Sequence, residues 1–444
     1  MNQFKYQIIA AKISAKIAAG EFPKGSKLPT HRVLAKQWGT TAVTVSKAYQ
    51  LLVEQRQIES FVGRGSYVLE QRLENVIHAL TAEVDINFSI LQPCMTANLV
   101  DLHYQCQQSL GTTNMHQLLS YSENSGLLEH RQAGANWCRH YGLSVANPEQ
   151  IILTNGAQNA LTSLIQLYSN QGDCIAVEAQ TYPGLLSICK YLRRRVVPIA
   201  MDEQGMIAEA LQAQCLLEKP ALVVVVPSQQ NPTGATMSLQ RRQQIAQVVV
   251  DQDIWLIEDD IYAFLNKRKI QPISNLIADR AFYISSLSKA IGPGLRCGYL
   301  KVPVEQQVIM KDFIRATLWM PSPLVFEMAS GMINSGAAFA WASEQKNIAS
   351  FRQRLVTEYL SEYQIARQSS SYSCWLHLPK CWQSSAFTEA CHKEGLLVSD
   401  AAYFSVAEKV NAVRLSVMAE ADQQRFVVGL SLLARLLSGK TDSP

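Results

Sequence analysis

Long apolar runs are absent from this sequence. The strongest, residues 221–226, is far shorter than the roughly 20 residues that a membrane-spanning helix needs. The ten cysteines form no C-x-x-C pair, and the eight histidines show no spacing typical of metal ligands. No targeting segment is visible, since residues 1–10 are polar and include Lys5. We therefore expect a cytoplasmic protein with reduced, mostly buried thiols, no metal site and no membrane partner.

Extremes of composition are also missing. Of the 444 residues, 48% are hydrophobic and 17% are charged, which is typical of a globular protein rather than a disordered one. The length exceeds one ordinary core, so two or three domains are expected. The net charge of +4 is uneven: residues 1–72 hold eleven Lys or Arg against four Glu, a net of +7, and the rest carries −3. This asymmetry predicts a polyanionic partner for the N-terminal part alone.

The first 70 residues predict a small DNA-binding fold. Helices are expected over residues 4–19, 30–37 and about 41–56, the second capped by Thr30 and the third by Thr40 or Thr41. Two short β runs, 58–61 and 66–69, surround a tip that contains Arg64 between glycines. This order is that of a winged helix-turn-helix, in which the second helix of the pair enters the major groove. The alternative is a small accessory domain whose lysines are only solvated surface.

An ordered set of residues in this part resembles the DNA-binding domain of the GntR family. The matching residues are Gly25-Ser26-Lys27-Leu28-Pro29-Thr30-His31-Arg32, Leu34-Ala35, Thr44-Val45, Ala48-Tyr49, Leu52 and Gly63-x-Gly65-Ser66-Tyr67-Val68. The resemblance implies DNA contacts from one residue of the first paired helix, three of the recognition helix and one of the wing: Arg32, Thr41, Thr44, Lys47 and Arg64. The apolar residues of the motif are interpreted as core: Leu28, Leu34, Val45, Tyr49 and Leu52. Thr30 stands where the family usually has serine, and Gln57 where glycine is common before the wing.

Residues 71–85 are interpreted as a linker between two domains, residues 1–70 and 86–444. The linker contains no Pro or Gly, and Leu73, Val76, Ile77 and Leu80 have helical spacing. A short ordered helix and a disordered tether are both compatible with this composition.

From residue 86 onward, strands alternate with helices. Strands are expected at residues 151–154, 173–178, 221–226, 254–257 and 281–285, which predicts an α/β fold with a mostly parallel, doubly wound sheet. After residue 302, long helices and short strands near 372–377 and 412–417 predict a smaller C-terminal α+β lobe. We expect a large domain over about 115–300, and a small lobe over about 301–444 together with 86–114.

Chemically distinctive residues follow several of these strands. Gly156 opens a helix whose N-terminus is a ready anion site, and the turn at 227–234 and the carboxylates at 258–260 lie at strand ends, where α/β sites form. The stretch 285–299 offers Lys289 and Arg296 among serines and glycines. We interpret Lys289 as carrying a cofactor aldehyde as a Schiff base, and Arg296 with nearby hydroxyls as holding the cofactor's phosphate. The alternative is a glycine-rich turn with a solvated lysine.

Four motifs in order resemble a fold-type I pyridoxal-phosphate enzyme of the class I/II aminotransferase kind, over about residues 86–437. They are Asn231-Pro232-Thr233-Gly234, Asp259-x-x-Tyr262, Ser286-x-Ser288-Lys289 and Arg296-x-Gly298. The resemblance implies pyridoxal 5'-phosphate as the cofactor, with Lys289, Asp259 and Tyr262 as catalytic residues. Asp259 would pair with the protonated ring nitrogen, and Asn231 and Tyr262 would hydrogen-bond the ring oxygen. The other implied contacts are the stacking ring of Tyr182 and the phosphate-binding residues Gly156, Ala157, Gln158, Ser286, Ser288, Arg296 and, from the neighbouring subunit, Tyr121.

The substrate side of the same site both matches and departs from this family. Arg414 matches the arginine that grips a substrate α-carboxylate with two parallel hydrogen bonds. Residues 89–93 read Ser-Ile-Leu-Gln-Pro where glycines are usual, and residues 400–403 lack the usual Pro-Gly. These departures touch substrate access rather than cofactor anchoring, so cofactor binding is better supported than efficient transamination.

The fusion of a GntR-type head to an aminotransferase-like body resembles the MocR subfamily of bacterial transcription regulators. It implies a homodimer that binds double-stranded operator DNA and senses an amino acid, an amine or pyridoxal phosphate through aldimine chemistry. We expect little or no transaminase turnover. Two alternatives stay open: an active aminotransferase with an appended DNA-binding domain, and a sensor of pyridoxal phosphate itself, against which Arg414 weighs modestly.

Overall fold

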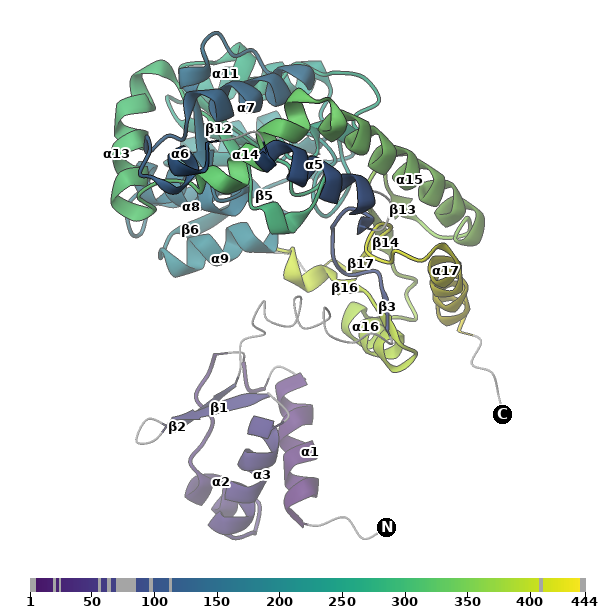
Figure 1. Ribbon diagram of the computed structural model, residues 1–444. Coiled ribbons are helices and arrows are strands. Elements are labelled where there is room, and N and C mark those ends of the chain that lie inside the picture. The colour runs from purple at the N-terminus through teal and green to yellow at the C-terminus, as the bar shows by residue number, and fades with distance from the viewer. Residues whose placement is uncertain are drawn as a thin grey trace. The chain divides into compact units, whose positions relative to one another are not determined.

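The computed structural model describes residues 5–18, 21–23, 25–54, 57–61, 65–68, 85–95, 99–111, 114–406 and 410–439. The chain divides into two compact units, Met1–His78 and Ala79–Pro444, whose elements are labelled in Figure 1. Residues 71–84 of the predicted linker, which was expected over 71–85, and the wing residue Arg64 lie outside the described residues.

The described residues of the first unit form three helices and a hairpin in the expected order. They are α1 (Lys5–Ala18), α2 (His31–Gln37), α3 (Ala42–Glu54), β1 (Ile58–Phe61) and the antiparallel β2 (Gly65–Val68). The five residues interpreted as core are all buried. Thr41 caps α3, because its hydroxyl accepts a hydrogen bond from the Thr44 N–H at 3.2 Å. Thr30 takes the extended backbone of an N-cap residue at α2, but its side chain makes no capping hydrogen bond.

The second unit is built on a seven-stranded sheet. Its order is β4 (Ile151–Thr154), β12 (Gly298–Lys301), β11 (Ala281–Ser286), β10 (Trp255–Asp259), β9 (Leu222–Val225), β5 (Cys174–Glu178) and β6 (Arg195–Ile199). The strands from β11 to β6 pair in parallel, and β12 runs antiparallel to both of its neighbours. The predicted mostly parallel α/β fold is therefore confirmed. β10 runs two residues further than predicted, so Glu258 and Asp259 belong to the strand itself.

Helices cover both faces of this sheet, which makes it doubly wound (Figure 1). One face packs against α8 (Ala157–Tyr168), α9 (Pro183–Tyr191) and α13 (Gln307–Thr317). The other packs against α10 (Ala208–Glu218), α11 (Leu239–Asp251) and α12 (Ile273–Leu276), and near β4 against α7 (Leu128–His140). The helices α5 (Leu99–Gly111), α6 (Met115–Leu119), α14 (Pro323–Asn334) and α15 (Ala337–Tyr359) complete this layer arrangement.

A smaller lobe follows α15. Its four-stranded sheet has the order β13 (Ile365–Ala366), β14 (Ser373–His377), β17 (Ala412–Ser416) and β16 (Ser399–Asp400). The helices α16 (Ser384–Lys393) and α17 (Gln423–Leu437) pack on it, and β15 (Leu396–Leu397) pairs in parallel with β3 (Ile86–Asn87). A separate hairpin joins β7 (Met201–Asp202) to β8 (Gly205–Met206). β3 thus belongs to this lobe, although it precedes the strands of the large sheet in the sequence.

No helix within the described ranges is long and apolar enough to cross a membrane. All ten cysteines are free thiols, and all but Cys106 and Cys381 are buried.

Candidate functional site

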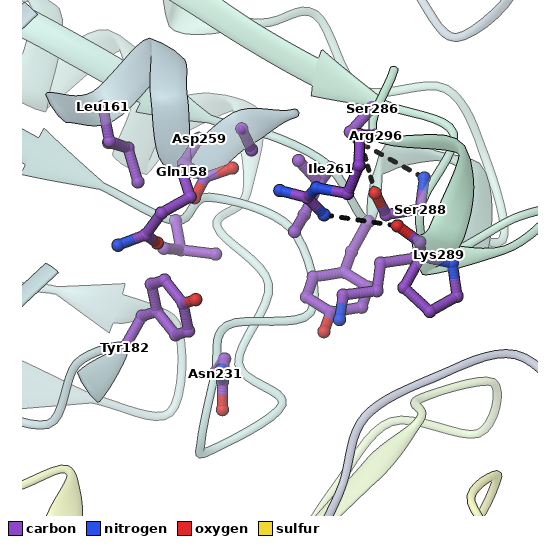
Figure 2. Close-up of a pocket in the computed structure, with 14 residues that line it drawn as sticks. Gln158, Leu161, Tyr182, Asn231, Asp259, Ile261, Ser286, Ser288, Lys289 and Arg296 are labelled. Atoms are coloured by element: carbon purple, nitrogen blue, oxygen red, sulfur yellow. Dashed lines mark hydrogen bonds between the residues drawn. The ribbon is translucent and has the colours of Figure 1, made fainter. Parts of the chain in front are cut away.

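A pocket opens at the carboxyl ends of the parallel strands, where side chains from several strands meet (Figure 2). It brings together ten residues that the sequence motifs predicted: Ala157, Gln158, Tyr182, Asn231, Asp259, Tyr262, Ser286, Ser288, Lys289 and Arg296. In Figure 2, Lys289, Ser288 and Arg296 gather on one side, and Gln158 and Tyr182 lie on the other. Residues up to 139 positions apart in the sequence, from Ala157 to Arg296, therefore share one site.

Lys289 supplies the amine of the pocket. It follows β11, and its Nζ donates to the backbone carbonyl of Leu91 at 2.5 Å. Burial lowers the pKa of Lys289 to about 8; the cations Arg414 and Arg296 act in the same direction and Asp259 opposes them. A lysine with such a pKa is partly neutral near pH 8, which is the form that attacks a carbonyl.

Asp259 supplies a carboxylate at the end of β10, where it accepts a hydrogen bond from the Ile261 N–H. It is 5% exposed, and its Oδ1 is buried without a hydrogen-bond partner among the described residues. Burial raises its pKa to about 7, and the neighbouring charge of Asp260 adds to this effect. A buried acceptor without a donor is costly, so this oxygen fits a ligand that brings an N–H⁺ group.

An anion-binding corner lies beside Lys289. The Ser286 hydroxyl donates to the Cys297 carbonyl at 2.8 Å, and its oxygen lies 3.0 Å from the Ser288 hydroxyl, within hydrogen-bond distance. This pairing holds both hydroxyls at the pocket wall, where the guanidinium of Arg296 joins them. Because Arg296 is a fixed planar donor and the N-terminus of α8 opens nearby, the corner suits a phosphate group.

Two glycines permit the close packing behind this corner. Gly156 is the N-cap of α8 with φ +80°, and a Cβ there would lie 2.5 Å from Nη2 of Arg296. A Cβ on Gly298 would lie 2.4 Å from Oγ1 of Thr154 and 2.8 Å from the carbonyl carbon of Gly156. Side chains at either position would push Arg296 or β12 away from the helix N-terminus.

The pocket's aromatic wall is formed by two tyrosines. Tyr262 is 3% exposed, and burial raises its pKa well above the ordinary value. Burial also raises the pKa of Tyr182, whose ring packs so close to Gly184 that a Cβ there would lie 2.4 Å from it. Both hydroxyls therefore stay protonated near neutral pH and can donate to an acceptor in the pocket.

Arg414 reaches this site from β17 of the small lobe. Its Nη1 donates to Oδ1 of Asn231 at 2.8 Å, its Nη2 donates to the Ser89 carbonyl, and its guanidinium lies 4.6 Å from the ring centre of Phe404. Burial lowers its pKa to about 10. Nε has no hydrogen-bond partner within the described ranges. Arg414 therefore keeps its charge and has a donor to spare for an anion.

Tyr121 lies apart from the pocket of its own chain. Its side chain is 84% exposed, and its ring contacts Trp319 at a centroid distance of 5.9 Å. The implied role in a neighbouring subunit's phosphate site therefore stays a prediction.

The predicted DNA-contacting residues of the first unit lie on α2 and α3. Arg32 and Lys47 are exposed, and Thr41 and Thr44 are joined by their hydroxyl groups at 2.8 Å at the start of α3. Val43, which the motif did not single out, is 67% exposed in the first turn of α3. An exposed valine on a recognition helix can contact thymine methyl groups. Only the structure reveals that Val43 is exposed, because sequence periodicity alone does not indicate it.

Sequence reasoning also missed parts of the pocket. Leu161, Val226, Ile261 and Pro293 line it without belonging to a recognised motif. The carbonyl groups of Ser89 and Leu91 accept hydrogen bonds from Arg414 and Lys289. They belong to the segment 89–93, which is distinctive in sequence only because its side chains are larger than the usual glycines. A backbone carbonyl has no sequence signature, so these contacts required the fold. No cluster of His, Cys, Asp and Glu suited to a metal ion occurs among the residues described.

Comparison with known families agrees with this division. Residues 83–430 match Aminotransferase class I and II, and residues 5–68 match Bacterial regulatory proteins, gntR family. The uncharacterized HTH-type transcriptional regulator YdeF of Bacillus subtilis is 27% identical over 441 residues, which cover 98% of this chain and 95% of that protein. The 2-aminoadipate transaminase of Thermus thermophilus is 24% identical over 332 residues, which cover 72% of this chain and 82% of that protein.

Solved structures share the fold of the second unit. Kynurenine aminotransferase of Pyrococcus horikoshii, solved with PMP, superposes with a TM-score of 0.76 at 21% identity, covering 84% of this chain and 96% of its own. The α-aminoadipate aminotransferase LysN of Thermus thermophilus, complexed with N-(5'-phosphopyridoxyl)-L-leucine, gives 0.72 at 20% identity, with 82% and 94% covered. The chain belongs to the aminotransferase class I and II family, which depends on pyridoxal phosphate, and it carries a gntR-family regulatory domain at its N-terminal end, a fusion of the MocR type.

Proposed function

We propose that this chain is a pyridoxal-phosphate-dependent, DNA-binding transcriptional regulator whose aminotransferase-like domain senses an amino compound. The observation that carries the proposal is the presence, on one chain, of a gntR-family unit and a pocket with two buried basic side chains. Lys289 provides an amine of lowered pKa, and Arg414 provides a guanidinium that keeps its charge. A buried amine of lowered pKa that lines a pocket is typical of a functional group.

The residues of the pocket suit the cofactor one by one. When bound, pyridoxal phosphate supplies an aldehyde that condenses with amines and a ring that withdraws electrons. Asp259 offers its unpartnered Oδ1 to the ring N–H⁺, and Asn231 and Tyr262 offer donors to the ring oxygen. The anion-binding corner offers Ser286, Ser288 and Arg296 to the phosphate, with Gly156, Ala157 and Gln158 at the start of α8.

Arg414 favours an effector that carries a carboxylate. Its guanidinium is oriented by Asn231 and by the Ser89 carbonyl, and Nε is left to donate. A carboxylate bound here would compete with the Ser89 carbonyl for Nη2. Ser89 lies on the segment 85–95, which follows the linker residues in the sequence. Effector binding can regulate DNA binding only if the effector prefers one of two arrangements of this region, and displacement of Ser89 provides such a preference.

An active aminotransferase with an appended DNA-binding domain is the second candidate. The complete set of Lys289, Asp259, Tyr262 and Arg414 favours it, as does similarity to the 2-aminoadipate transaminase. A sensor of pyridoxal phosphate alone is the third, but such a sensor would not need a buried Arg414 with a donor left for a carboxylate.

A homodimer fits the outer surface of the second unit. The helix α5 has no buried residue, and Leu119, Tyr121 and Trp319 are 72%, 84% and 51% exposed. Apolar side chains gathered in this way mark a surface that another chain covers, and a partner's Tyr121 would complete the phosphate corner. The free thiols and the DNA-binding unit favour a cytoplasmic location.

The proposal is tested by screening amines and amino acids against the full-length protein loaded with pyridoxal phosphate. We expect one compound class to change the absorption spectrum and also the affinity for DNA from the protein's own upstream region. Lys289→Ala should lose the borohydride-reducible link to the cofactor, and the exposed Lys269→Ala should keep it. Rapid formation of a keto acid without an effect on DNA binding would favour the aminotransferase instead. An effect of pyridoxal phosphate alone would favour the cofactor sensor.

A further inference from the structure

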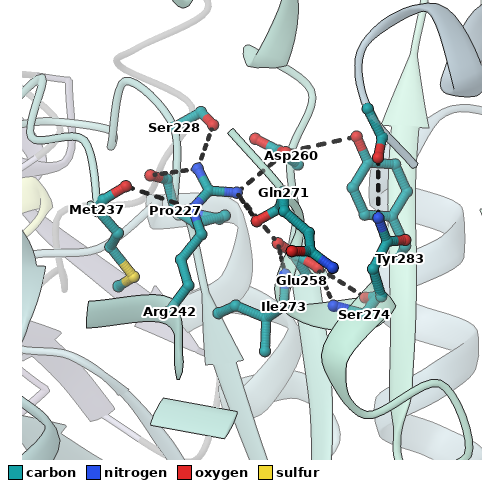
Figure 3. Close-up of polar contacts among 12 residues, drawn as sticks. Pro227, Ser228, Met237, Arg242, Glu258, Asp260, Gln271, Ile273, Ser274 and Tyr283 are labelled. Carbon is teal, nitrogen blue, oxygen red and sulfur yellow. Dashed lines mark hydrogen bonds and ion pairs between the residues drawn. The ribbon is translucent and has the colours of Figure 1, made fainter. Parts of the chain in front are cut away.

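Arg242 is a fully buried arginine that no recognised motif contains (Figure 3). It extends from α11, and its guanidinium donates to four backbone or side-chain oxygens. Nη2 donates to the Pro227 carbonyl at 3.2 Å and to the Ser228 hydroxyl at 3.0 Å. Nε donates to the Met237 carbonyl at 3.3 Å, and Nη1 to the Gln271 carbonyl at 3.5 Å. Pro227 and Ser228 begin the turn that carries Asn231 into the pocket.

The same guanidinium faces the two carboxylates beside Asp259. Nη1 of Arg242 lies 3.6 Å from Oε1 of Glu258 and 4.0 Å from Oδ2 of Asp260. Glu258 is 0% exposed and Asp260 2% exposed, whereas Asp259 between them lines the pocket. Successive side chains of an extended strand point to opposite faces, so Arg242 stands behind Asp259.

The two carboxylates depend on Arg242 to different degrees. Glu258 also accepts the Ile273 N–H at 2.9 Å, the Ser274 N–H at 2.8 Å and the Ser274 hydroxyl at 2.6 Å. Asp260 has hydrogen bonds only with two hydroxyl groups, those of Tyr283 at 3.4 Å and Ser228, and its Oδ1 is without a partner in the described part of the chain. Arg242 is therefore the main counter-charge of Asp260.

Other charged groups face Asp259 from different elements. Lys289 lies on the pocket side, and Glu178, buried at the end of β5, adds a second acidic group. The charge of Asp260 raises the proton affinity of Asp259, and Lys289 lowers it. The balance between Arg242 and Asp260 thus acts on the carboxylate that would bind the ring nitrogen.

We propose that Arg242 is a positioning residue of the cofactor site, which ties the Asn231 turn to the Asp259 end of β10 and balances the charge of Asp260. This inference rests on the proposed function, because it assumes that the cofactor ring lies between Asp259 and Asn231. One guanidinium holds both supports, so the spacing of the two ring-binding residues is set by a group that touches neither. A lysine cannot replace it, because a single ammonium group cannot reach the separate oxygens that the planar guanidinium contacts with its three nitrogens.

The test uses the full-length protein and pyridoxal phosphate labelled with ¹⁵N at the ring nitrogen. Arg242→Lys, Asp260→Asn and the control Arg241→Lys are compared with the wild type by cofactor titration and by the ring ¹⁵N chemical shift. Arg241 is the adjacent arginine on α11, and it pairs with Asp202 at 2.6 Å, away from the pocket. We expect Arg242→Lys to weaken cofactor binding about tenfold or more, as loss of groups that orient a site's ligands does. Asp260→Asn should move the ring resonance toward the unprotonated form, and Arg241→Lys should change neither quantity.

The outcomes separate the inference from the function on which it rests. A purely structural role would lower the unfolding midpoint of Arg242→Lys while the folded protein kept the wild-type affinity and ring resonance, and this result would overturn the inference. If Arg242→Lys does not fold, Asp260→Asn decides alone, and an unchanged resonance counts against the inference. If the wild type itself binds no pyridoxal phosphate, the cofactor assignment fails and the inference fails with it.

Discussion

Glu178 is a buried carboxyl group that contacts the turn next to the pocket. Its side chain is 0% exposed at the end of β5, and it accepts hydrogen bonds from the Gln230 amide at 3.1 Å and the Val226 N–H at 3.4 Å. Gln230 in turn accepts from the Thr233 N–H at 3.0 Å, so this chain of contacts stabilises the turn that carries Asn231. Burial raises the pKa of Glu178 to about 8.

The raised pKa predicts a pH-dependent stability. Glu178 binds more protons in the folded than in the unfolded state between its unfolded pKa of 4.5 and about 8, so the free energy of unfolding should fall as pH rises through this window. Each unit of pKa displacement corresponds to about 1.4 kcal/mol. In Glu178→Gln the fall between pH 5 and 8 should be smaller, as measured by urea unfolding of the cofactor-free protein. The exposed Glu305→Gln is the control, and equal slopes for the two variants would contradict the prediction.

At the scale of elements, the contact between β12 and the start of α8 shapes the anion-binding corner. β12 is the antiparallel strand between β4 and β11, and Gly298 begins it. Because a Cβ on Gly298 would collide with the backbone of Gly156, the strand and the helix can approach only with glycine there.

Gly298→Ala should therefore separate β12 from α8. We expect the free energy of unfolding to fall by about 1–3 kcal/mol, the usual cost of overpacking, and cofactor affinity to fall with it. Gly294→Ala is a matched control, since a Cβ there meets nothing within 4 Å. Urea unfolding and cofactor titration measure the two effects. Equal behaviour of the two variants would show that the corner tolerates the added methyl group.

The exposed basic residue of α3 leads to a prediction about DNA binding by the first unit. Lys47 is exposed on α3, and phosphate contacts by lysine release counterions from DNA. Lys47→Ala should weaken binding across sequences and reduce the slope of log affinity against log salt by about 1, measured by fluorescence anisotropy. Lys5→Ala on α1 changes the same charge outside the predicted contact surface. If Lys5→Ala reduced the slope as much, the effect would be one of net charge rather than of a phosphate contact.

At the scale of the whole molecule, the exposed apolar surface around α6 predicts self-association. Leu119→Glu places a charge in this surface and should shift the protein toward monomer in sedimentation velocity experiments. Val304 is 68% exposed at a separate place, so Val304→Glu is a control of equal charge and similar exposure. A Leu119→Glu variant that sediments as the wild type does would contradict the proposed interface.

Much of this architecture was predictable because its signals are local. β4 begins and ends where the apolar run predicted, and the order of the strands that carry Asn231, Asp259 and Lys289 follows from periodicity and turn residues. β12 was missed as a strand, because its four residues follow the phosphate motif without a distinctive pattern of their own.

The amino-acid order was sufficient to predict the two folds and to indicate the candidate site residues, since a lysine, an aspartate and an arginine at fixed offsets after apolar strands form short motifs. It could not reveal which groups lie behind them. Arg242, Glu178 and the carbonyls of Ser89 and Leu91 act on the site from segments remote in the chain. Their roles depend on burial and on distances of a few ångströms, which arise only when the strands and helices pack together.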